Sequence, residues 1–266
     1  RQVGSGSFKL VYKARWLQSQ RESQVVAILR IRGSGSFGNN EEFEKELQIF
    51  QQLGRHPNLL RLLAVTIDPA SGDSCLVTEF APKGSLDIML SEFAEKQEAV
   101  SLLVQLQVAK QICDGMVQLS LHDVVHRDLA TRNVLVFSLD VRDHLGVCVK
   151  IADYGLSIVA SRRQGEGQGA SVSTAGTAAR PVRWMAPESI RRRQYSEKSD
   201  VWSFGVTMWE IWTHAEVPYG ACTDDAALGW KVVEGERLPP PPDCPAAVYT
   251  IMRECWRENK HERPSF

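Results

Sequence analysis

The 266-residue sequence has no excess of basic charge, no paired cysteines and no long apolar run. Its 31 lysines and arginines are offset by 32 acidic residues, and the net charge of −1 disfavours a nucleic-acid-binding role. The six cysteines include no C-x-x-C pair, so we expect reduced thiols rather than a zinc site or a disulfide framework. A run of 18 apolar residues and a signal-type leader are both missing, which predicts a soluble segment without its own membrane span.

The composition that is present is that of an ordinary globular protein, 43% hydrophobic and 24% charged. The first third has the apolar pattern of short strands, at residues 10–15, 25–31, 62–67 and 75–80. Between the second and third of these, Glu41–Leu53 has the periodicity of a helix with one apolar face. This part of the chain is therefore predicted to be a small sheet with one helix.

From about residue 100 onward the periodicity is helical. Apolar residues recur at helical spacing over 102–116. The stretch Val201–Trp212 is apolar around its whole circumference, which predicts a helix buried at the centre of a domain, with its three tryptophans in the core. The pattern indicates an α+β fold with a small β-rich lobe at 1–81 and a larger helical lobe at 82–266, joined near residues 81–84.

A glycine motif at residues 33–38 offers an alternative. Its sequence fits G-x-G-x-x-G, follows a predicted strand and precedes a predicted helix, as in dinucleotide-binding folds. That fold expects an acidic residue about 20 positions further on. Here residues 57–60 are Pro-Asn-Leu-Leu, and the next acid is Asp68. We therefore interpret residues 33–40 as a flexible loop.

Two short strings carry the chemistry. The first is His126-Arg127-Asp128-Leu129-Ala130-Thr131-Arg132-Asn133, and the second, twenty residues after its asparagine, is Asp153-Tyr154-Gly155. A phosphoryl-transfer site needs a carboxylate that accepts a proton from the attacking hydroxyl, and an amide and a carboxylate that hold Mg²⁺. The strings resemble the catalytic loop and the metal-binding loop of eukaryotic protein kinases.

The resemblance covers nearly the whole chain, down to Glu262-Arg263-Pro264 near its end. It implies a single bilobal protein-kinase domain over residues 1–266, trimmed at both ends, with ATP and Mg²⁺ as cofactors. By the same resemblance, Asp128 orients the substrate hydroxyl and accepts its proton, and Asn133 and Asp153 hold Mg²⁺.

The nucleotide-binding strings depart from the family pattern at two places. Gly4-Ser5-Gly6-Ser7-Phe8 resembles the glycine-rich loop, in which bare backbone approaches the phosphates, but its third glycine is replaced by Lys9. The strand that should end in the phosphate-binding lysine ends in Leu29 instead. The loop is similar to that of the with-no-lysine kinases, which place their catalytic lysine at the position of Lys9.

Two accounts of the missing lysine remain open: a pseudokinase that acts as a nucleotide-binding scaffold, or a kinase with a relocated lysine. Glu46 favours relocation, because it falls on the apolar face of its helix, three residues after Phe43, where a carboxylate needs a cation. Lys9 is the implied partner. Strand alternation directs Arg30 to the opposite face, and Lys13 has the pattern of a surface residue.

The segment 76–81 resembles the kinase hinge, with Thr78 as gatekeeper and the backbone of Glu79 and Ala81 as the adenine-binding groups. The resemblance assigns the following residues to nucleotide binding: Gly4, Ser5, Gly6, Val11, Ala27, Thr78, Glu79, Ala81 and Leu135. It assigns catalysis to Asp128, Lys9, Glu46 and Arg132.

The substrate class follows from the residues after Asp128. Serine/threonine kinases carry a lysine two positions later, where this chain has Ala130, whereas Arg132 stands where receptor-type tyrosine kinases carry an arginine. Residues 181–188 resemble the tyrosine-kinase segment that forms an apolar platform for a phenol ring. The implied partners are ATP and tyrosine-containing protein substrates. The implied setting is a receptor that dimerises, with this domain on the cytoplasmic face of the plasma membrane.

The resemblance also implies supporting contacts. Glu188 and Arg263 would form a buried ion pair, and Asp200 would accept backbone hydrogen bonds from the catalytic loop. Tyr154 would pack with Phe50, Leu62 and His126 in a column between the lobes. The segment 161–179 is rich in Gly, Ser and Gln and is predicted to be mobile.

Overall fold

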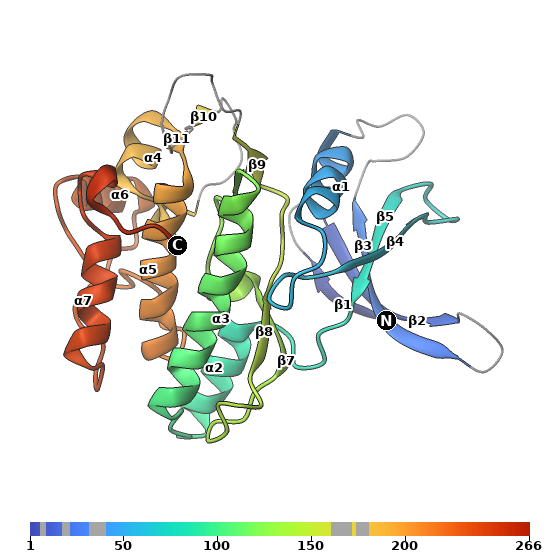
Figure 1. Ribbon diagram of the computed structural model, residues 1–266, viewed down its shortest axis with the longest axis horizontal. Coiled ribbons are helices and arrows are strands. Elements are labelled where there is room, and N and C mark those ends of the chain that lie inside the picture. The colour runs from blue at the N-terminus through green and yellow to red at the C-terminus, as the bar shows by residue number, and fades with distance from the viewer. Residues whose placement is uncertain (6–8, 18–21, 32–40, 161–171, 174–180) are drawn as a thin grey trace.

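The computed structural model describes residues 1–5, 9–17, 22–31, 41–160, 172–173 and 181–266. They form two parts, a sheet with one helix and a larger helical body (Figure 1). The predicted flexible loop at 33–40 lies outside the described residues, as does the predicted mobile segment 161–179 apart from residues 172–173. The α+β architecture predicted from the sequence is confirmed.

The N-terminal part is a five-stranded sheet in the order β1-β2-β3-β5-β4. Its elements are β1 (Gln2–Ser5), β2 (Lys9–Leu17), β3 (Ser23–Ile31), α1 (Glu41–Leu53), β4 (Leu62–Ile67) and β5 (Ser74–Glu79). The four predicted strands are present to within two residues, and α1 has the predicted bounds. Every pairing in this sheet is antiparallel, which excludes the parallel dinucleotide-binding fold.

Helix α1 begins with three glutamates in its first turn, where the positive end of the helix dipole stabilises them. Its buried face carries Phe43, Ile49, Phe50 and Leu53. Glu46 lies on the same face, as its spacing predicted, and is 1% exposed, so it is not a half-exposed residue at the edge of that face. A charge at this depth requires a cationic partner or a proton.

The C-terminal part is mainly helical. Its helices are α2 (Leu86–Glu95), α3 (Leu102–Leu121), α4 (Pro187–Arg192), α5 (Glu197–Trp212), α6 (Asp225–Val233) and α7 (Ala246–Cys255), with 3-10 turns η1 (Thr131–Asn133), η2 (Val182–Trp184) and η3 (Lys260–Glu262). Its short strands are β6 (Val124–Val125), β7 (Val134–Ser138), β8 (Cys148–Ile151), β9 (Ile158–Val159), β10 (Val172–Ser173) and β11 (Gln194–Tyr195).

Helix α5 is buried around its circumference, as its apolar pattern predicted. A capping box between Ser196 and Ser199 satisfies backbone donors at its first turn. Gly205 allows close packing, because a Cβ at this position would lie 2.7 Å from Trp256 Nε1. This central helix provides the rigid support against which the catalytic segments lie.

The two parts are joined where the connection after α1 meets β8. The amide of Leu60 donates to Ile151 O (2.8 Å), and the amide of Ile151 donates to Asn58 O (2.9 Å). Asn58 is buried and donates through its side chain to Gln111 Oε1 and Val149 O, both at 3.1 Å. These bonds place the end of β8, and therefore the Asp153 loop, beside the sheet.

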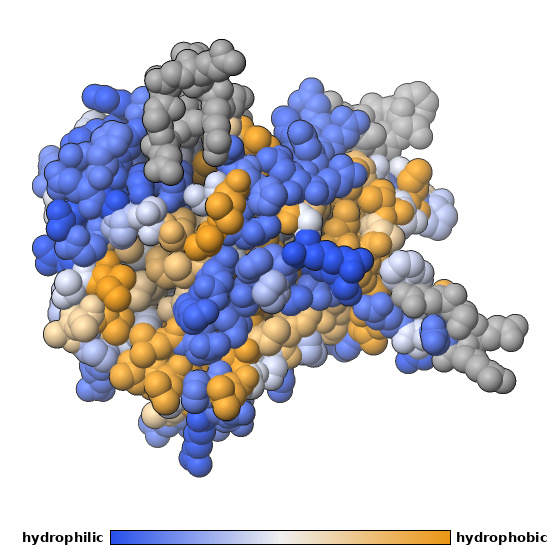
Figure 2. Space-filling view, viewed as in Figure 1, coloured by the Kyte–Doolittle hydropathy of each residue, from blue (hydrophilic) through white to orange (hydrophobic). Residues whose placement is uncertain are grey.

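The surface differs between the two ends of the helical body. On the face shown in Figure 2, hydrophilic side chains cover α1 and the upper part of the helical body, and apolar side chains gather at its lower end. Exposed apolar side chains at the start of α3 include Leu102, Leu103 and Leu106. Within the described parts of the chain, none of the helices has the length and apolarity needed to cross a bilayer.

Candidate active site

The catalytic loop is anchored on helix α5 by Asp200. Its carboxylate accepts the amide of His126 (2.7 Å) and the amide of Arg127 (2.9 Å), as predicted. Burial raises the pKa of Asp200 to about 7, a rise that the two amide donors limit. Arg127 has a φ of 70°, and its guanidinium lies 4.3 Å from the centre of the Tyr195 ring. The loop is thus held in a conformation that few non-glycine residues adopt.

Asp128 lies within a cluster of side chains from its own loop. Arg132 forms an ion pair with Asp128. The side-chain nitrogen Nδ2 of Asn133 donates to the backbone oxygen of Asp128 (2.7 Å) and to its Oδ2 atom (2.9 Å). The Asp128 side chain keeps 15% of its surface exposed. It is therefore oriented by its neighbours and remains accessible to a substrate hydroxyl.

The two predicted magnesium ligands come from neighbouring segments. The amide of Ala152 donates to Asn133 O (2.9 Å), which brings Asp153 next to the catalytic loop. Because Asn133 uses its Nδ2 atom on Asp128, Oδ1 is the atom that it can offer to a metal. Burial would raise the pKa of Asp153, but Lys9 and the amide of Gly155 lower it below its ordinary value. An ionised carboxylate and an amide oxygen fit Mg²⁺.

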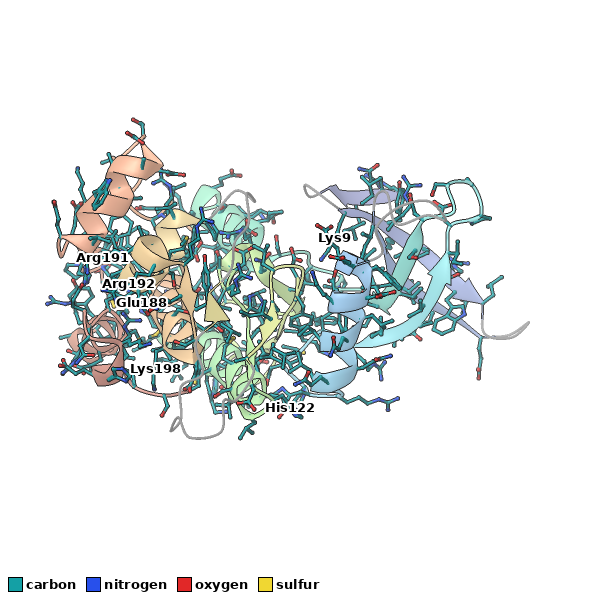
Figure 3. The ribbon with its side chains drawn as sticks, turned by 90° about the horizontal axis from the view of Figure 1, so that it is seen from above. Lys9, His122, Glu188, Arg191, Arg192 and Lys198 are labelled. Carbon is teal, nitrogen blue, oxygen red and sulfur yellow. The ribbon has the colours of Figure 1, made fainter. Side chains whose placement is uncertain are left out.

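Lys9 reaches the same place from strand β2. Its ammonium lies 2.7 Å from Glu46 and 2.7 Å from Asp153 Oδ1. Figure 3 shows Lys9 beside helix α1. Burial would lower the pKa of Lys9, but the two carboxylates raise it above its ordinary value, so the side chain is a cation at neutral pH. Burial raises the pKa of Glu46, and Lys9 offsets part of that rise.

The other cations near Leu29 are engaged elsewhere. Arg30 forms an ion pair with Asp68 at 2.7 Å. The ammonium of Lys13 lies 4.6 Å from the centre of the Phe80 ring. Leu29 itself is 8% exposed and belongs to the core. The geometry therefore brings Lys9, rather than Arg30 or Lys13, to the carboxylates of the site.

The metal loop is supported by an aromatic column. The ring of Tyr154 lies 5.0 Å from that of Phe50 and 5.9 Å from that of His126. Burial raises the pKa of Tyr154, and its hydroxyl donates to Ile151 O (3.1 Å). Burial also lowers the pKa of His126, whose Nδ1 accepts the amide of Asp128 and whose Nε2 lies 3.1 Å from Ala152 O. His126 is thus a neutral packing residue.

The residues assigned to nucleotide binding come from strands β1, β2, β3 and β5, from the segment after β5 and from β7. Thr78 is fully buried, and its hydroxyl donates to Glu79 O (3.2 Å). Ala27 and Ala81 are each 8% exposed, and Val11 and Leu135 pack partly buried against the same core. Of the predicted phosphate-loop residues, Gly4 pairs with Val11, the backbone of Ser5 pairs with Leu10, and Gly6 lies outside the described residues.

The predicted substrate segment packs on the helical body. Arg263 forms two bonds to the Glu188 carboxylate, at 2.7 and 2.8 Å, as predicted. Figure 3 places Glu188 on the side of the helical body away from Lys9. In η2, the Trp184 ring lies 4.2 Å below the Arg132 guanidinium. The platform and the catalytic loop are therefore in direct contact.

The sequence did not predict the contacts or burial of three charged residues near the site. Lys150 forms an ion pair with Glu79 at 2.7 Å. Arg183 donates to three carbonyls of the loop after α5 and pairs with Asp225 at 3.0 Å. Glu210 is buried within α5. A signal existed for Glu210, because an acidic residue inside an otherwise apolar helix must find donors.

Comparisons with known proteins agree with this arrangement. The family model for protein tyrosine and serine/threonine kinases matches residues 1–266. Tyrosine-protein kinase transmembrane receptor Ror of Drosophila melanogaster is 35% identical over 267 residues, covering 100% of this chain and 36% of the relative. Human Ephrin type-A receptor 1 is 35% identical over 266 residues (99% and 25%), and human Tyrosine-protein kinase Srms is 38% identical over 267 residues (100% and 49%).

The chain spans between about a quarter and a half of the length of these relatives. The family model, in contrast, extends from its first residue to its last. With the kinase strings, the two-part architecture and this match together, the chain belongs to the protein tyrosine and serine/threonine kinase family.

Proposed function

We propose that this chain is an ATP- and Mg²⁺-dependent protein-tyrosine kinase in which Lys9 replaces the lysine missing at Leu29. The observation that carries the proposal is the Lys9 ammonium, 2.7 Å from Glu46 and 2.7 Å from Asp153. In kinases, a lysine paired with the glutamate of the N-lobe helix contacts the phosphates, while the metal-loop aspartate holds Mg²⁺. Here the ammonium of Lys9, on β2, contacts the carboxylates of both Glu46 and Asp153.

The division of chemical roles follows from the site. Asp128 would accept the proton of the substrate hydroxyl, with Arg132 and Asn133 fixing its orientation. Asn133 and Asp153 would hold Mg²⁺, which neutralises charge on the phosphates when it is bound. The backbone of Glu79 and Ala81 would hydrogen-bond the adenine, whose faces would lie against apolar side chains.

Tyrosine specificity is supported by Arg132 and Trp184. Ala130 stands where serine/threonine kinases carry a lysine, and Arg132 pairs with Asp128 and contacts the Trp184 ring. A phenol is longer than a serine side chain, so it can reach Asp128 from a platform set further out. All three relatives reported above carry a tyrosine-kinase or receptor name.

We also propose the setting that these names suggest. The chain would be one kinase domain, with a lobe at residues 1–81 and a lobe at 82–266. It would lie at the cytoplasmic face of the plasma membrane within a receptor that dimerises, since two of the relatives are named as receptors. Its substrates would be tyrosine-containing proteins.

A pseudokinase scaffold is the second candidate. It is favoured by Leu29, an apolar residue at the usual lysine position, and by the contact between Lys9 and Asp153, which a metal ion would have to share. On this account the domain binds nucleotide without transferring phosphate.

The deciding experiment is ATP-dependent labelling of a poly-Glu/Tyr peptide at saturating ATP and Mg²⁺, with Asp128→Asn as the control. We expect phosphotyrosine that Asp128→Asn abolishes. Nucleotide binding without phosphotyrosine above the control level would establish the scaffold and exclude the kinase. Preferential labelling of a serine peptide would contradict only the specificity.

A further inference from the structure

The helical body contains a cavity of about 530 Å³. One wall is formed by the loop that follows α5, residues 216–222, and the other by the last turn of α6 and residues 236–239. The volume lies within the range of cavities that bind small molecules or a few peptide side chains, about 300–1,000 Å³. The proposed chemistry uses none of the residues that line this cavity.

The buried part of the lining is apolar and is held in place by hydrogen bonds. Trp209 and Leu238 both line the cavity and belong to the core. The Trp209 indole N–H donates to Pro239 O (2.9 Å), and the Tyr249 hydroxyl donates to Leu238 O (2.9 Å). These bonds fix the backbone of residues 238–239, so the cavity is formed before a ligand binds and little conformational entropy is lost on binding.

The exposed part of the lining carries unpaired charges. Glu216 and Glu236 stand on opposite walls and are exposed, and among the residues that the structure describes neither carboxylate has an ion pair. Arg237 is paired with Glu258 at 3.2 Å, which leaves Lys231 as the unpaired cation of the described lining. Two unpaired carboxylates outweigh one ammonium, so the cavity favours a ligand with a positive charge.

One wall of the cavity is tied to the substrate segment. Arg183 belongs to η2 of that segment. Its guanidinium donates to three carbonyl oxygens of the 216–222 loop, those of Pro218, Tyr219 and Cys222, at 2.8–3.0 Å. This side chain therefore fixes the cavity wall relative to the platform on which the substrate tyrosine would lie.

We infer that this cavity is a docking subsite for the substrate protein, which inserts an apolar side chain beside a lysine or arginine from a segment outside the phosphorylated tyrosine. The apolar side chain would lie against Trp209 and Leu238, and the cation would pair with Glu216 and Glu236. The inference rests on the proposed tyrosine-kinase function and specifies which substrates the site selects. Docking should lower KM for a long substrate and leave the chemical step unchanged.

Binding is measured by NMR with the Trp209 indole N–H as the reporter, because this group lies in the lining. Trp209→Phe assigns its signal. The probe is a short amidated peptide with a leucine followed by an arginine, and its two controls carry serine in place of leucine or glutamate in place of arginine. We expect a saturable shift with the probe and a much weaker response to both controls. An unshifted indole signal at millimolar probe, or equal affinity for the controls, would overturn the inference.

Variants of the lining separate charge from shape. Glu216→Gln combined with Glu236→Gln removes both carboxylates and should weaken binding of the probe by roughly 3- to 10-fold, as expected for exposed ion pairs. Ala221→Trp fills the cavity from an exposed position and should abolish binding. Glu234→Gln is the matched control, since Glu234 is an exposed acid after α6 that does not line the cavity. Binding that survives Ala221→Trp, or an equal loss in Glu234→Gln, counts against the subsite.

Transfer is measured with long peptides that join an acceptor tyrosine to leucine-arginine or to serine-glutamate, through glycine-serine linkers of several lengths on either side. At the best length the leucine-arginine peptide should have a KM roughly 3- to 10-fold lower, with kcat within about two-fold. Ala221→Trp should remove this difference and leave transfer to a short tyrosine peptide unchanged. Equal KM values at every linker length contradict the substrate role. If wild type transfers no phosphate, the proposed function fails, and the NMR titration still decides whether the cavity binds the probe.

Discussion

The ammonium of Lys9 lies 2.7 Å from the carboxylate of Glu46, although the lysine belongs to β2 and not to β3. The two strands are paired, with Lys9 opposite Ile31 and Val11 opposite Leu29. A long side chain that starts on β2 therefore reaches the point that a lysine at position 29 would reach from β3. The buried Glu46 gains a cation by this route.

Removing the Lys9 ammonium should abolish most of the activity. If it stabilises the charge that develops on the phosphates, Lys9→Met should lower kcat by roughly 10²-fold or more in the peptide assay. Lys13→Met is the matched control, because Lys13 lies on the same strand but contacts the Phe80 ring. Near-normal turnover in Lys9→Met would rule out the relocation and direct attention to Arg30 or Lys13.

A lysine at position 29 should partly replace the one at position 9. Leu29→Lys alone is expected to change kcat less than Lys9→Met does. In the Lys9→Met background it should recover part of the activity, because positions 9 and 29 lie on the same face of two paired strands. The measurement is the initial rate of peptide phosphorylation by the two single variants and the double variant. A double variant that is no faster than Lys9→Met would show that a lysine at position 29 cannot take the role of Lys9.

The stability of the fold should depend on the pairing of Glu46. Lys9→Met leaves this carboxylate, 1% exposed, without its cation and should lower the free energy of unfolding by about 1–3 kcal/mol. Adding Glu46→Gln removes the buried charge and should restore part of the loss. Urea denaturation of the three proteins measures this, and a double variant less stable than Lys9→Met would contradict it.

The contact between Lys9 and Asp153 should make stability depend on pH with a defined sign. The pKa of Asp153 in the folded protein lies below its ordinary 3.8. The ion pair therefore stabilises the fold above pH 3.8, and this stabilisation is lost as the pH falls through the pKa of the folded protein. The pKa of Lys9 in the folded protein lies above 10.5. The same ion pair therefore stabilises the fold below pH 10.5, and this stabilisation is lost as the pH rises through the pKa of the folded protein. The difference in free energy of unfolding between wild type and Asp153→Asn should therefore be constant from about pH 5 to 10 and shrink at both extremes.

Activity should not require phosphorylation of an activation-segment tyrosine. The sequence has no tyrosine between Gly155 and Glu188, so the usual pairing of a phosphotyrosine with loop arginines has no residue to act on. Phosphatase-treated and untreated domain should show equal initial rates on a peptide. A long lag that autophosphorylation relieves would contradict this expectation, whereas serine or threonine phosphorylation within 171–177 by another kinase would leave it intact.

Several features of the fold could be predicted from the sequence because they depend on local spacing. Helix α1 has the predicted bounds, and α5 is buried around its circumference, since both patterns repeat within a few turns. The catalytic and metal-loop strings identify the family because each is a short run of neighbouring residues. The spacing of Glu46 predicted that it lies on the apolar face of its helix, and the structure shows that it is buried there.

The tertiary structure alone decided which distant groups meet. Lys9 lies 37 residues from Glu46 and 144 from Asp153, and Glu210 lies 79 from Thr131 and 26 from Trp184. No local period encodes such contacts, because they depend on how the strands are registered and on where the loops return to α5. The sequence by itself determined the chemical groups of the site and the elements that carry them. Folding determined that Lys9 contacts Glu46 and Asp153 and that Glu210 accepts the Trp184 indole N–H, because a buried charge is stable only where the fold supplies a partner.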